Sequence, residues 1–323
     1  MQKIHAQFAL CLCLTAFLFS CSKTENNVST VETYSSMNDV FGKLSLQPKV
    51  LTVDAATGGS FFGNSGTRYY FIPNSFQTAI GASVTGNIQI AVTEYLQKGD
   101  MIFSKMLPVS NGVPIVSGGE VTIYAKQGSQ EIFLKPGFNC YISIPTVGTP
   151  PTGMQLFTGQ PVVDTSIMKT NWILPQRDSS KYNVGVFVFM GIPYGDTLNV
   201  ISDSLRSINC DYFLGLGAAD LKNCTLSITA TGVDTASTKN ALVYAIFDNK
   251  KLIYPMYRSY GSPGITYSLK NVPADPIHFV AFTLVNGQFY GGTLKATPAS
   301  GANFNLNLLP QDAKAFKAQL NGL

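Results

Sequence analysis

Histidine is scarce in this sequence, and the scarcity limits the chemistry that its side chains can perform. The chain of 323 residues contains two histidines, His5 and His278. His5 lies in an N-terminal segment that is expected to be removed on export, as described below. His278 is therefore the one base left for a Ser-His-Asp or Cys-His site, and a histidine-rich zinc cluster is excluded. His278 is in phase with Val280 and Phe282 in a strand-like run, where a packed or hydrogen-bonded structural role is the expected one.

Paired carboxylates are the remaining catalytic option, because glycosidases need only two Asp or Glu side chains across a cleft. The candidates are Glu94, Glu120, Asp196, Asp203, Asp211 and Asp220. Glu94 is in phase with an apolar run, and a carboxylate that escapes to solvent at a strand end explains this more simply than catalysis. The acid-rich stretch 196–220 lacks the spacing of a calcium loop, although weak calcium binding stays open. The sequence thus predicts no catalytic residue, no metal site and no cofactor.

The cysteines divide into two groups. Three of the six lie within the first 21 residues, and the others are Cys140, Cys210 and Cys224. An odd number cannot all pair internally. The spacing of Cys210 and Cys224 would permit a disulfide in an oxidising compartment. The alternative is that all three are small buried apolar residues.

The N-terminus has the layout of an export signal. Lys3 precedes an apolar stretch from Phe8 to Phe19, which is too short to span a bilayer, and Ser20 follows it. A cysteine directly after such a small residue resembles the bacterial lipobox, in which the thiol is acylated and held on a membrane. An ordinary signal peptide that contains cysteines is the alternative. We expect residues 1–20 to be a lipoprotein signal peptide and Cys21 to be the lipidation site.

The composition indicates an all-β protein without a strong surface charge. There are 22 Lys and Arg against 18 Asp and Glu, which gives a formal charge of +4, and charged residues make up 12% of the chain. Because these few charged residues form no basic cluster in the sequence, nucleic acid is not an expected partner. Turn-forming glycines and strand-forming Val, Thr, Tyr and Phe are common, whereas long helical runs are missing.

Short runs with period-two alternation fill the segment from residue 46 to residue 146. Ile88 to Val92 and Val121 to Ala125 alternate apolar with other side chains, and Gly and Pro separate such runs. This pattern is typical of an antiparallel sandwich or barrel. We therefore expect an N-terminal β-sandwich over residues 46–146. Residues 21–45 are polar and without sustained periodicity, which predicts a flexible tether.

A second set of strands is predicted after residues 147–153. That segment contains adjacent prolines flanked by glycines, which cannot continue a ladder, and it is expected to be a linker. Asn286-Gly287 stands between two β-rich runs and predicts a hairpin with a type I′ turn. The fold class is thus two antiparallel, Ig-like β-sandwiches in tandem, the second over residues 154–310. Residues 311–323 are expected to form a short helical tail.

A series of motifs carries a resemblance to a known module. The series includes Phe71-Ile72-Pro73-Asn74-Ser75-Phe76, Gly86-Asn87-Ile88-Gln89-Ile90, Ser117-Gly118-Gly119 and Leu134-Lys135-Pro136-Gly137. It is similar to the β-sandwich module of netrin receptors, ankyrins and tight-junction scaffolds, as this module recurs in a family of Bacteroidetes outer-membrane lipoproteins. The resemblance implies an outer-membrane location, on either the surface or the periplasmic face, and it implies no catalytic residues.

Two further patterns concern sugars. Three short motifs resemble the acceptor motif of Bacteroidetes O-glycosylation, although so short a pattern also arises by chance. The candidate glycosylation sites are Thr197, Ser204 and Thr235. Tyrosines also recur at three-residue spacing and could stack on sugar rings, with core packing as the alternative. These are Tyr254, Tyr257 and Tyr260.

These observations favour a lipid-anchored cell-envelope protein that acts as a non-catalytic binding or structural module. Its expected partners are the membrane, through the lipid anchor, and an envelope protein or a glycan. The alternative is a surface lipoprotein that binds carbohydrate or hydrolyses glycans with carboxylates. An exposed cleft that holds two carboxylates beside an exposed aromatic ring would favour this alternative.

Overall fold

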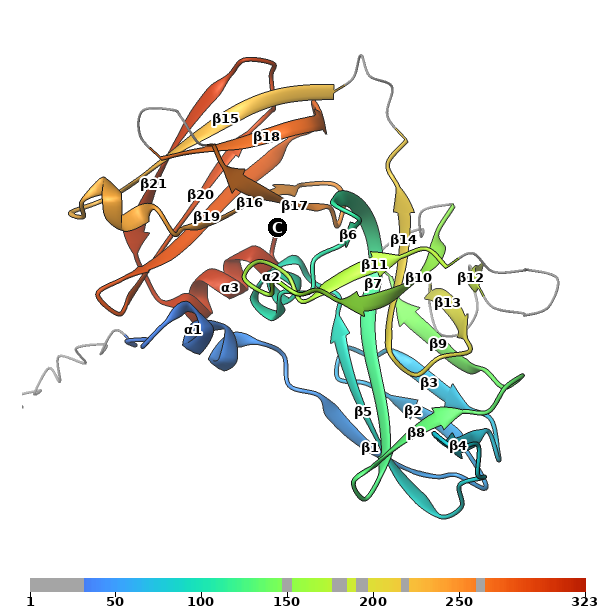
Figure 1. Ribbon diagram of the computed structural model, residues 1–323. Helices are drawn as coiled ribbons and strands as arrows, with labels where there is room; N and C mark the ends of the chain where they lie inside the picture. Colours follow the sequence, from blue (N-terminus) through green and yellow to red (C-terminus); the bar gives the residue numbers. More distant parts are fainter. Residues whose placement is uncertain (1–31, 147–152, 176–184, 190–196, 216–220, 260–264) are drawn as a thin grey trace, which may run out of the picture. The chain divides into compact units, whose positions relative to one another are not determined.

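The computed structural model describes residues 32–146, 153–175, 185–189, 197–215, 221–259 and 265–323 (Figure 1). Strands dominate these residues and helices are short, so the expected all-β fold is confirmed. The strands form two sheets that share one core, and a closed barrel. Among the helices of the described residues, none has the length and apolar character needed to cross a membrane.

The larger sheet of the sandwich has nine strands within the described residues. Its main path runs β1–β5–β7–β14–β10–β11, and β4, β6 and β8 pair beside it. The strands are β1 (Lys49–Asp54), β4 (Phe76–Thr78), β5 (Asn87–Tyr95), β6 (Val109–Ser110), β7 (Val113–Gln127), β8 (Gln130–Leu134), β10 (Gln155–Pro161), β11 (Thr170–Ile173) and β14 (Ser207–Phe213).

The smaller sheet faces the same core and has the order β12–β13–β9–β3–β2 in the described part of the chain. Its strands are β2 (Gly59–Phe62), β3 (Arg68–Phe71), β9 (Cys140–Pro145), β12 (Gly185–Phe189) and β13 (Thr197–Ser202). Alternate residues of each strand enter the core, as Ile142 and Ile144 of β9 do opposite Ile88 and Ile90 of β5. The other face of this sheet therefore points away from the core.

The remaining strands close into a barrel (Figure 1). They are β15 (Leu221–Ala230), β16 (Leu242–Phe247), β17 (Ile253–Arg258), β18 (Thr266–Pro273), β19 (Ile277–Val285), β20 (Gln288–Ala296) and β21 (Asn303–Pro310). A short 3₁₀ helix, η2 (Thr235–Thr238), precedes β16. Asn286 and Gly287 have φ angles of 51° and 79° between β19 and β20, so the predicted hairpin is confirmed.

The strand pairing differs from the predicted division into two sandwiches. β13 pairs with β9 and β14 pairs with β7, so strands from both sides of residues 147–153 share the same two sheets. Within the span 154–310, the later strands form the barrel instead of a second sandwich. Pro-rich composition indicated where a ladder stops, but it did not indicate that the chain returns to the sheets it had left.

Three short helices lie side by side in the described chain (Figure 1): α1 (Met37–Leu44), α2 (Lys98–Ser104) and α3 (Ala313–Asn321). α3 falls in the tail for which a helix was expected. α1 corrects the predicted flexible tether, because residues 37–44 form an amphipathic helix whose apolar side is buried. Aromatic rings join the helices to the barrel. They are Phe41, Phe103 and Phe316 of the helices with Phe282 and Phe289 of the barrel.

Candidate functional site

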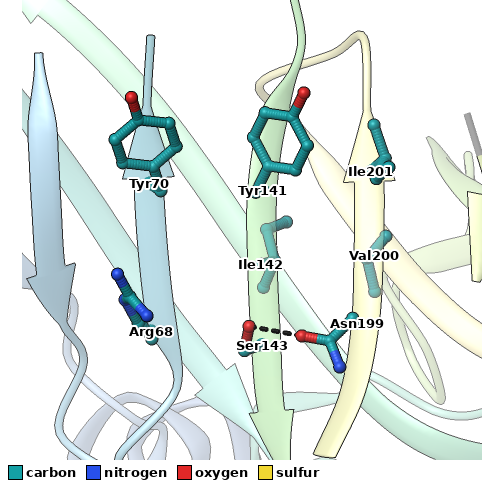
Figure 2. Close-up of a pocket in the computed structure, with 8 residues that line it drawn as sticks. All are labelled: Arg68, Tyr70, Tyr141, Ile142, Ser143, Asn199, Val200 and Ile201. Atoms are coloured by element: carbon teal, nitrogen blue, oxygen red, sulfur yellow. Dashed lines mark hydrogen bonds between the residues drawn. The ribbon is translucent and has the colours of Figure 1, made fainter. Parts of the chain in front are cut away.

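A hollow of about 440 Å³ opens on the face of the smaller sheet that points away from the core (Figure 2). Tyr70 and Tyr141 are its largest side chains, and they keep 37% and 38% of their surface exposed. Their sequence neighbours Tyr69, Phe71 and Ile142 are fully buried in the sandwich core. The period-two geometry of β3 and β9 thus fixes which side chains reach the hollow.

The strand register arranges the lining side chains in two parallel rows. We call Tyr70, Tyr141 and Ile201 the aromatic row, because β3, β9 and β13 place them directly opposite one another. We call Arg68, Ser143 and Asn199 the polar row, which the same three strands form two residues further along. Figure 2 shows the two tyrosine rings on neighbouring strands with their hydroxyls at the same end.

Contacts between side chains hold both rows in place. The centroids of the Tyr70 and Tyr141 rings are 5.9 Å apart at an angle of 48°, which is a favourable tilted contact. Ser143 Oγ donates a hydrogen bond of 2.6 Å to Asn199 Oδ1. Asn199 Nδ2 in turn donates to Thr197 Oγ1 at 2.9 Å, and this pair of bonds orients the amide. Arg68 donates to Ser60 Oγ on β2.

A second polar cluster is buried where β7 and β14 meet. Glu120 and Asp211 have no exposed surface. Asn209 Nδ2 lies between them and donates to Glu120 Oε1 at 3.3 Å and to Asp211 Oδ2 at 2.5 Å. Ser117 Oγ donates to Asn209 Oδ1 at 3.0 Å. Glu120 Oε2 and Asp211 Oδ1 make no hydrogen bond within the described residues, so the cluster is only partly satisfied.

A β-bulge produces this cluster. Asp211 lies opposite Ser117 whereas Cys210 lies opposite Gly119, so Gly118 is the extra residue in β7. A side chain at Gly118 would place its Cβ 2.9 Å from the carbonyl oxygen of Cys210, which explains the glycine. The bulge places Ser117 on the same face of β7 as Glu120, three residues away, so that Ser117 reaches Asn209.

Burial sets the protonation of the cluster. Complete desolvation raises the pKa of Glu120 and of Asp211 well above the usual carboxyl range, and for Glu120 the neighbouring Asp211 charge adds to this shift. Burial also lowers the pKa of Lys251, against the attraction of the two acids. Lys251 belongs to the β16–β17 turn, and its Nζ donates to the carbonyl of Gly118 at 3.2 Å. Its carbonyl accepts from the Ser117 amide at 3.0 Å, so this turn docks on the bulge.

The six candidate carboxylates therefore have different environments. Glu120 and Asp211 come together, but a substrate cannot lie between two acids without exposed surface, as a glycosidase would require. Asp203 is exposed in the turn after β13, and Asp196 and Asp220 lie outside the described residues. In the described residues, no group of three His, Cys, Asp or Glu side chains is placed to hold a metal ion.

Glu94 does not reach solvent, and this part of the sequence interpretation was wrong. Its side chain is buried, and its two oxygens accept from the amides of Ser65 and Thr67 at 2.7 and 2.9 Å. Backbone N–H groups replace water around the carboxylate because charge-assisted bonds of this kind are strong. Glu94 thus fixes the turn between β2 and β3.

The predicted disulfide is not formed. Cys140, Cys210 and Cys224 are free and buried. Cys210 lies on β14 in the sandwich core, whereas Cys224 lies on β15 in the barrel core. The three cysteines therefore agree with the alternative interpretation, in which they are small buried apolar residues. Cys21 lies outside the described residues.

The glycosylation candidates have unequal surroundings. Thr197 is half-buried at the start of β13, where its hydroxyl accepts from Asn199 Nδ2. Ser204 is half-buried in the turn before β14, where its amide and carbonyl both bond to Ser202. Thr235 begins η2.

The remaining sequence candidates are on the barrel. Tyr254 is half-buried, Tyr257 is 56% exposed, and Tyr260 lies outside the described residues. His278 Nδ1 lies 2.8 Å from Asp248 Oδ1, so this histidine is hydrogen-bonded within the barrel.

The hollow itself was missed from the sequence. Period-two geometry puts Tyr70 on the face opposite Tyr69 and Phe71, but the pairing of β3 with β9 was needed to bring Tyr141 beside it. Neither a family model nor a curated protein matches the sequence. The resemblance to the netrin-receptor module stays a prediction from motifs.

Proposed function

We propose that this protein is anchored by lipid at Cys21 in the outer membrane and acts as a non-catalytic binding module. The observation that carries the proposal is the hollow on the smaller sheet, where half-exposed rings and a fixed amide share one rigid surface. Of the described residues that line it, none is an acid, a histidine or a cysteine. Binding, and not bond cleavage, is the chemistry that this lining can perform.

The membrane location is part of the same proposal. It is supported by the apolar run before Ser20-Cys21 and by the polar residues that follow. Membership of the Bacteroidetes lipoprotein family belongs to it as well, on the motifs given above. Fractionation of cells that produce Cys21→Ser tests the anchor. The variant should leave the membrane fraction, and its retention there at the wild-type size would contradict lipidation at Cys21.

A footprinting experiment tests the binding role. The mature chain with Cys21→Ser would be exposed to hydroxyl radicals with and without a detergent-solubilised envelope extract. Oxidation of Tyr70 and Tyr141 should fall when the extract is present, because a ligand in the hollow covers both rings. Tyr124 and Tyr257 are matched controls, since they are 50% and 56% exposed and do not line this hollow. Equal oxidation of all four tyrosines with and without extract would refute the binding face.

A glycan-hydrolysing role finds less support. Its two best-placed acids, Glu120 and Asp211, are enclosed by the β7–β14 bulge and have no exposed surface. The carbohydrate-binding half of that alternative remains compatible with the hollow.

A further inference from the structure

We infer that the hollow on the smaller sheet is a saccharide-binding site, in which the aromatic row contacts the faces of sugar rings and the polar row binds their hydroxyl groups. This inference rests on the proposed binding function and adds the chemical class of the ligand. A pyranose presents C–H bonds on its faces and hydroxyls around its rim. A site that binds it therefore needs flat apolar surface and hydrogen-bonding groups side by side.

The aromatic row supplies the flat apolar surface. Tyr70 and Tyr141 expose a little more than a third of their surface, and their mutual contact holds the rings before a ligand arrives. Tyrosine gives a large contact area at a low cost in conformational entropy, because it has only two side-chain torsions. Ile201 extends the row onto β13. Because neighbouring strands are about 4.8 Å apart, the row is about 10 Å long.

The polar row lies at the correct distance to meet ring hydroxyls. It is two residues further along the same strands, which corresponds to about 7 Å. Asn199 keeps a second lone pair on Oδ1 after accepting from Ser143, and Ser143 Oγ keeps its own lone pairs. The bond from Asn199 to Thr197 fixes the amide in advance, and such preorganisation reduces the entropy lost on binding.

The size and charge of the hollow favour a saccharide over other ligands. Its volume of about 440 Å³ lies within the range of small-ligand sites, about 300 to 1,000 Å³. A protein partner would typically cover about 800 Å² of surface, which is far more than eight lining residues offer as a recessed site. A purely apolar ligand would offer no donor to the remaining lone pairs of Ser143 Oγ and Asn199 Oδ1, and the guanidinium of Arg68 disfavours a cationic ligand.

Glycan-array binding of the mature Cys21→Ser chain tests the inference, with glucans, mannans, xylans and uronate-containing oligosaccharides as probes. At least one oligosaccharide should bind, and calorimetry would then measure its affinity. Tyr141→Ala should weaken that affinity about tenfold or more, as expected for an aromatic anchor. Tyr141→Phe keeps the ring and should stay within about threefold of wild type. Tyr124→Ala removes a ring from β7 that is 50% exposed, against 38% for Tyr141, and should leave the affinity unchanged.

The outcomes separate the ligand class from the binding function. If no oligosaccharide binds but the envelope extract still protects Tyr70 and Tyr141 from oxidation, the saccharide is refuted and the binding role stands. If neither oligosaccharide binding nor protection of the tyrosines is observed, both the saccharide inference and the binding role are refuted. An oligosaccharide that binds Tyr141→Ala as well as wild type would place the sugar elsewhere and overturn the assignment of this site. The thermal unfolding temperatures of Tyr141→Phe and Tyr141→Ala are compared with that of wild type, so that a loss of affinity at the site can be told from a loss of folded protein.

Discussion

Replacement of Glu120 by Gln should stabilise the protein progressively as the pH rises. Full burial raises the pKa of the Glu120 carboxyl well above its usual 4.5, so the native protein keeps a proton that the unfolded chain releases. Native Glu120 therefore binds more protons than unfolded Glu120 between these two pKa values. Its contribution to stability is complete below pH 4.5 and is lost as the pH rises toward the folded-state pKa.

The magnitude follows from proton linkage. For each pH unit over which the native carboxyl stays protonated, wild type loses about 1.4 kcal/mol of unfolding free energy through this one group. Gln has nearly the same shape, can accept the Asn209 bond as Glu120 Oε1 does, and has no proton to release. The free-energy difference between Glu120→Gln and wild type should thus grow by about 1.4 kcal/mol per pH unit in favour of the variant.

Urea unfolding between pH 5 and pH 8 provides the assay. Trp172 is the single tryptophan and is fully buried, so its fluorescence reports the transition. Glu131→Gln is the matched control, because Glu131 is half exposed and lies 3.6 Å from Arg206 in a surface ion pair worth about 0 to 1 kcal/mol. Parallel stability curves for wild type and Glu120→Gln would show that the native carboxyl is ionised, and the reasoning about burial would be wrong.

Three other predictions concern packing and thiols. Gly118→Ala should lower the unfolding free energy by about 1 to 3 kcal/mol, because the added methyl group would press on the backbone of β14. In the control variant Gly215→Ala the added methyl group meets no atom within 4 Å, and calorimetry compares the two variants. Trp172→Phe loses the 2.9 Å bond from Nε1 to the Leu107 carbonyl and leaves a cavity, so circular dichroism should show a loss of about 2 to 4 kcal/mol. Burial raises the pKa of Cys224 to about 11, so a thiol reagent at pH 8 should label Cys224 and the other two buried cysteines only after unfolding. A native protein whose mass is two hydrogens below that of the reduced chain would contain a disulfide and would contradict the free thiols.

Local patterns predicted the elements of this fold better than their partners. Alternation over Ile88–Val92 and Val121–Ala125 places β5 and β7, and Asn286-Gly287 places the β19–β20 turn, because strand period and turn chemistry are local properties. Closure of the barrel depends on a parallel pairing of β15 with β21, which lie about 80 residues apart in the chain. No local signal encodes such a pairing.

The helix α1 shows a signal that was present but too short to stand out. Its eight residues make about two turns, so apolar periodicity has little length in which to show itself. Ser36 and Asp39 nevertheless form a capping arrangement, in which Ser36 Oγ accepts from the Asp39 amide and Asp39 accepts from the Ser35 amide. A search for caps would have found this helix within the predicted tether.

In the candidate hollow, too, long-range strand pairing could not be predicted from local sequence. The run Tyr69-Tyr70-Phe71 is typical of a strand, but only the structure shows that Tyr70 points outward between two buried rings. The proposed binding role of the hollow depends on Tyr141 and Asn199, which are supplied by strands that lie far along the chain. The buried acids illustrate the reverse case, because the β16–β17 turn, distant in the sequence, docks beside two promising carboxylates that have no exposed surface.

The first described residues also determine where a pull on the anchor would act. Tyr34 donates its amide to the carbonyl of Gly287 at 2.8 Å, and Lys317 Nζ bonds to the carbonyl of Leu44 at 2.8 Å. A lipid at Cys21 would therefore transmit mechanical force to the β19–β20 hairpin and to α3, and would not load the sandwich first. Ten residues lie between Cys21 and Glu32, so the eleven Cα-to-Cα steps that join these two residues reach at most about 40 Å.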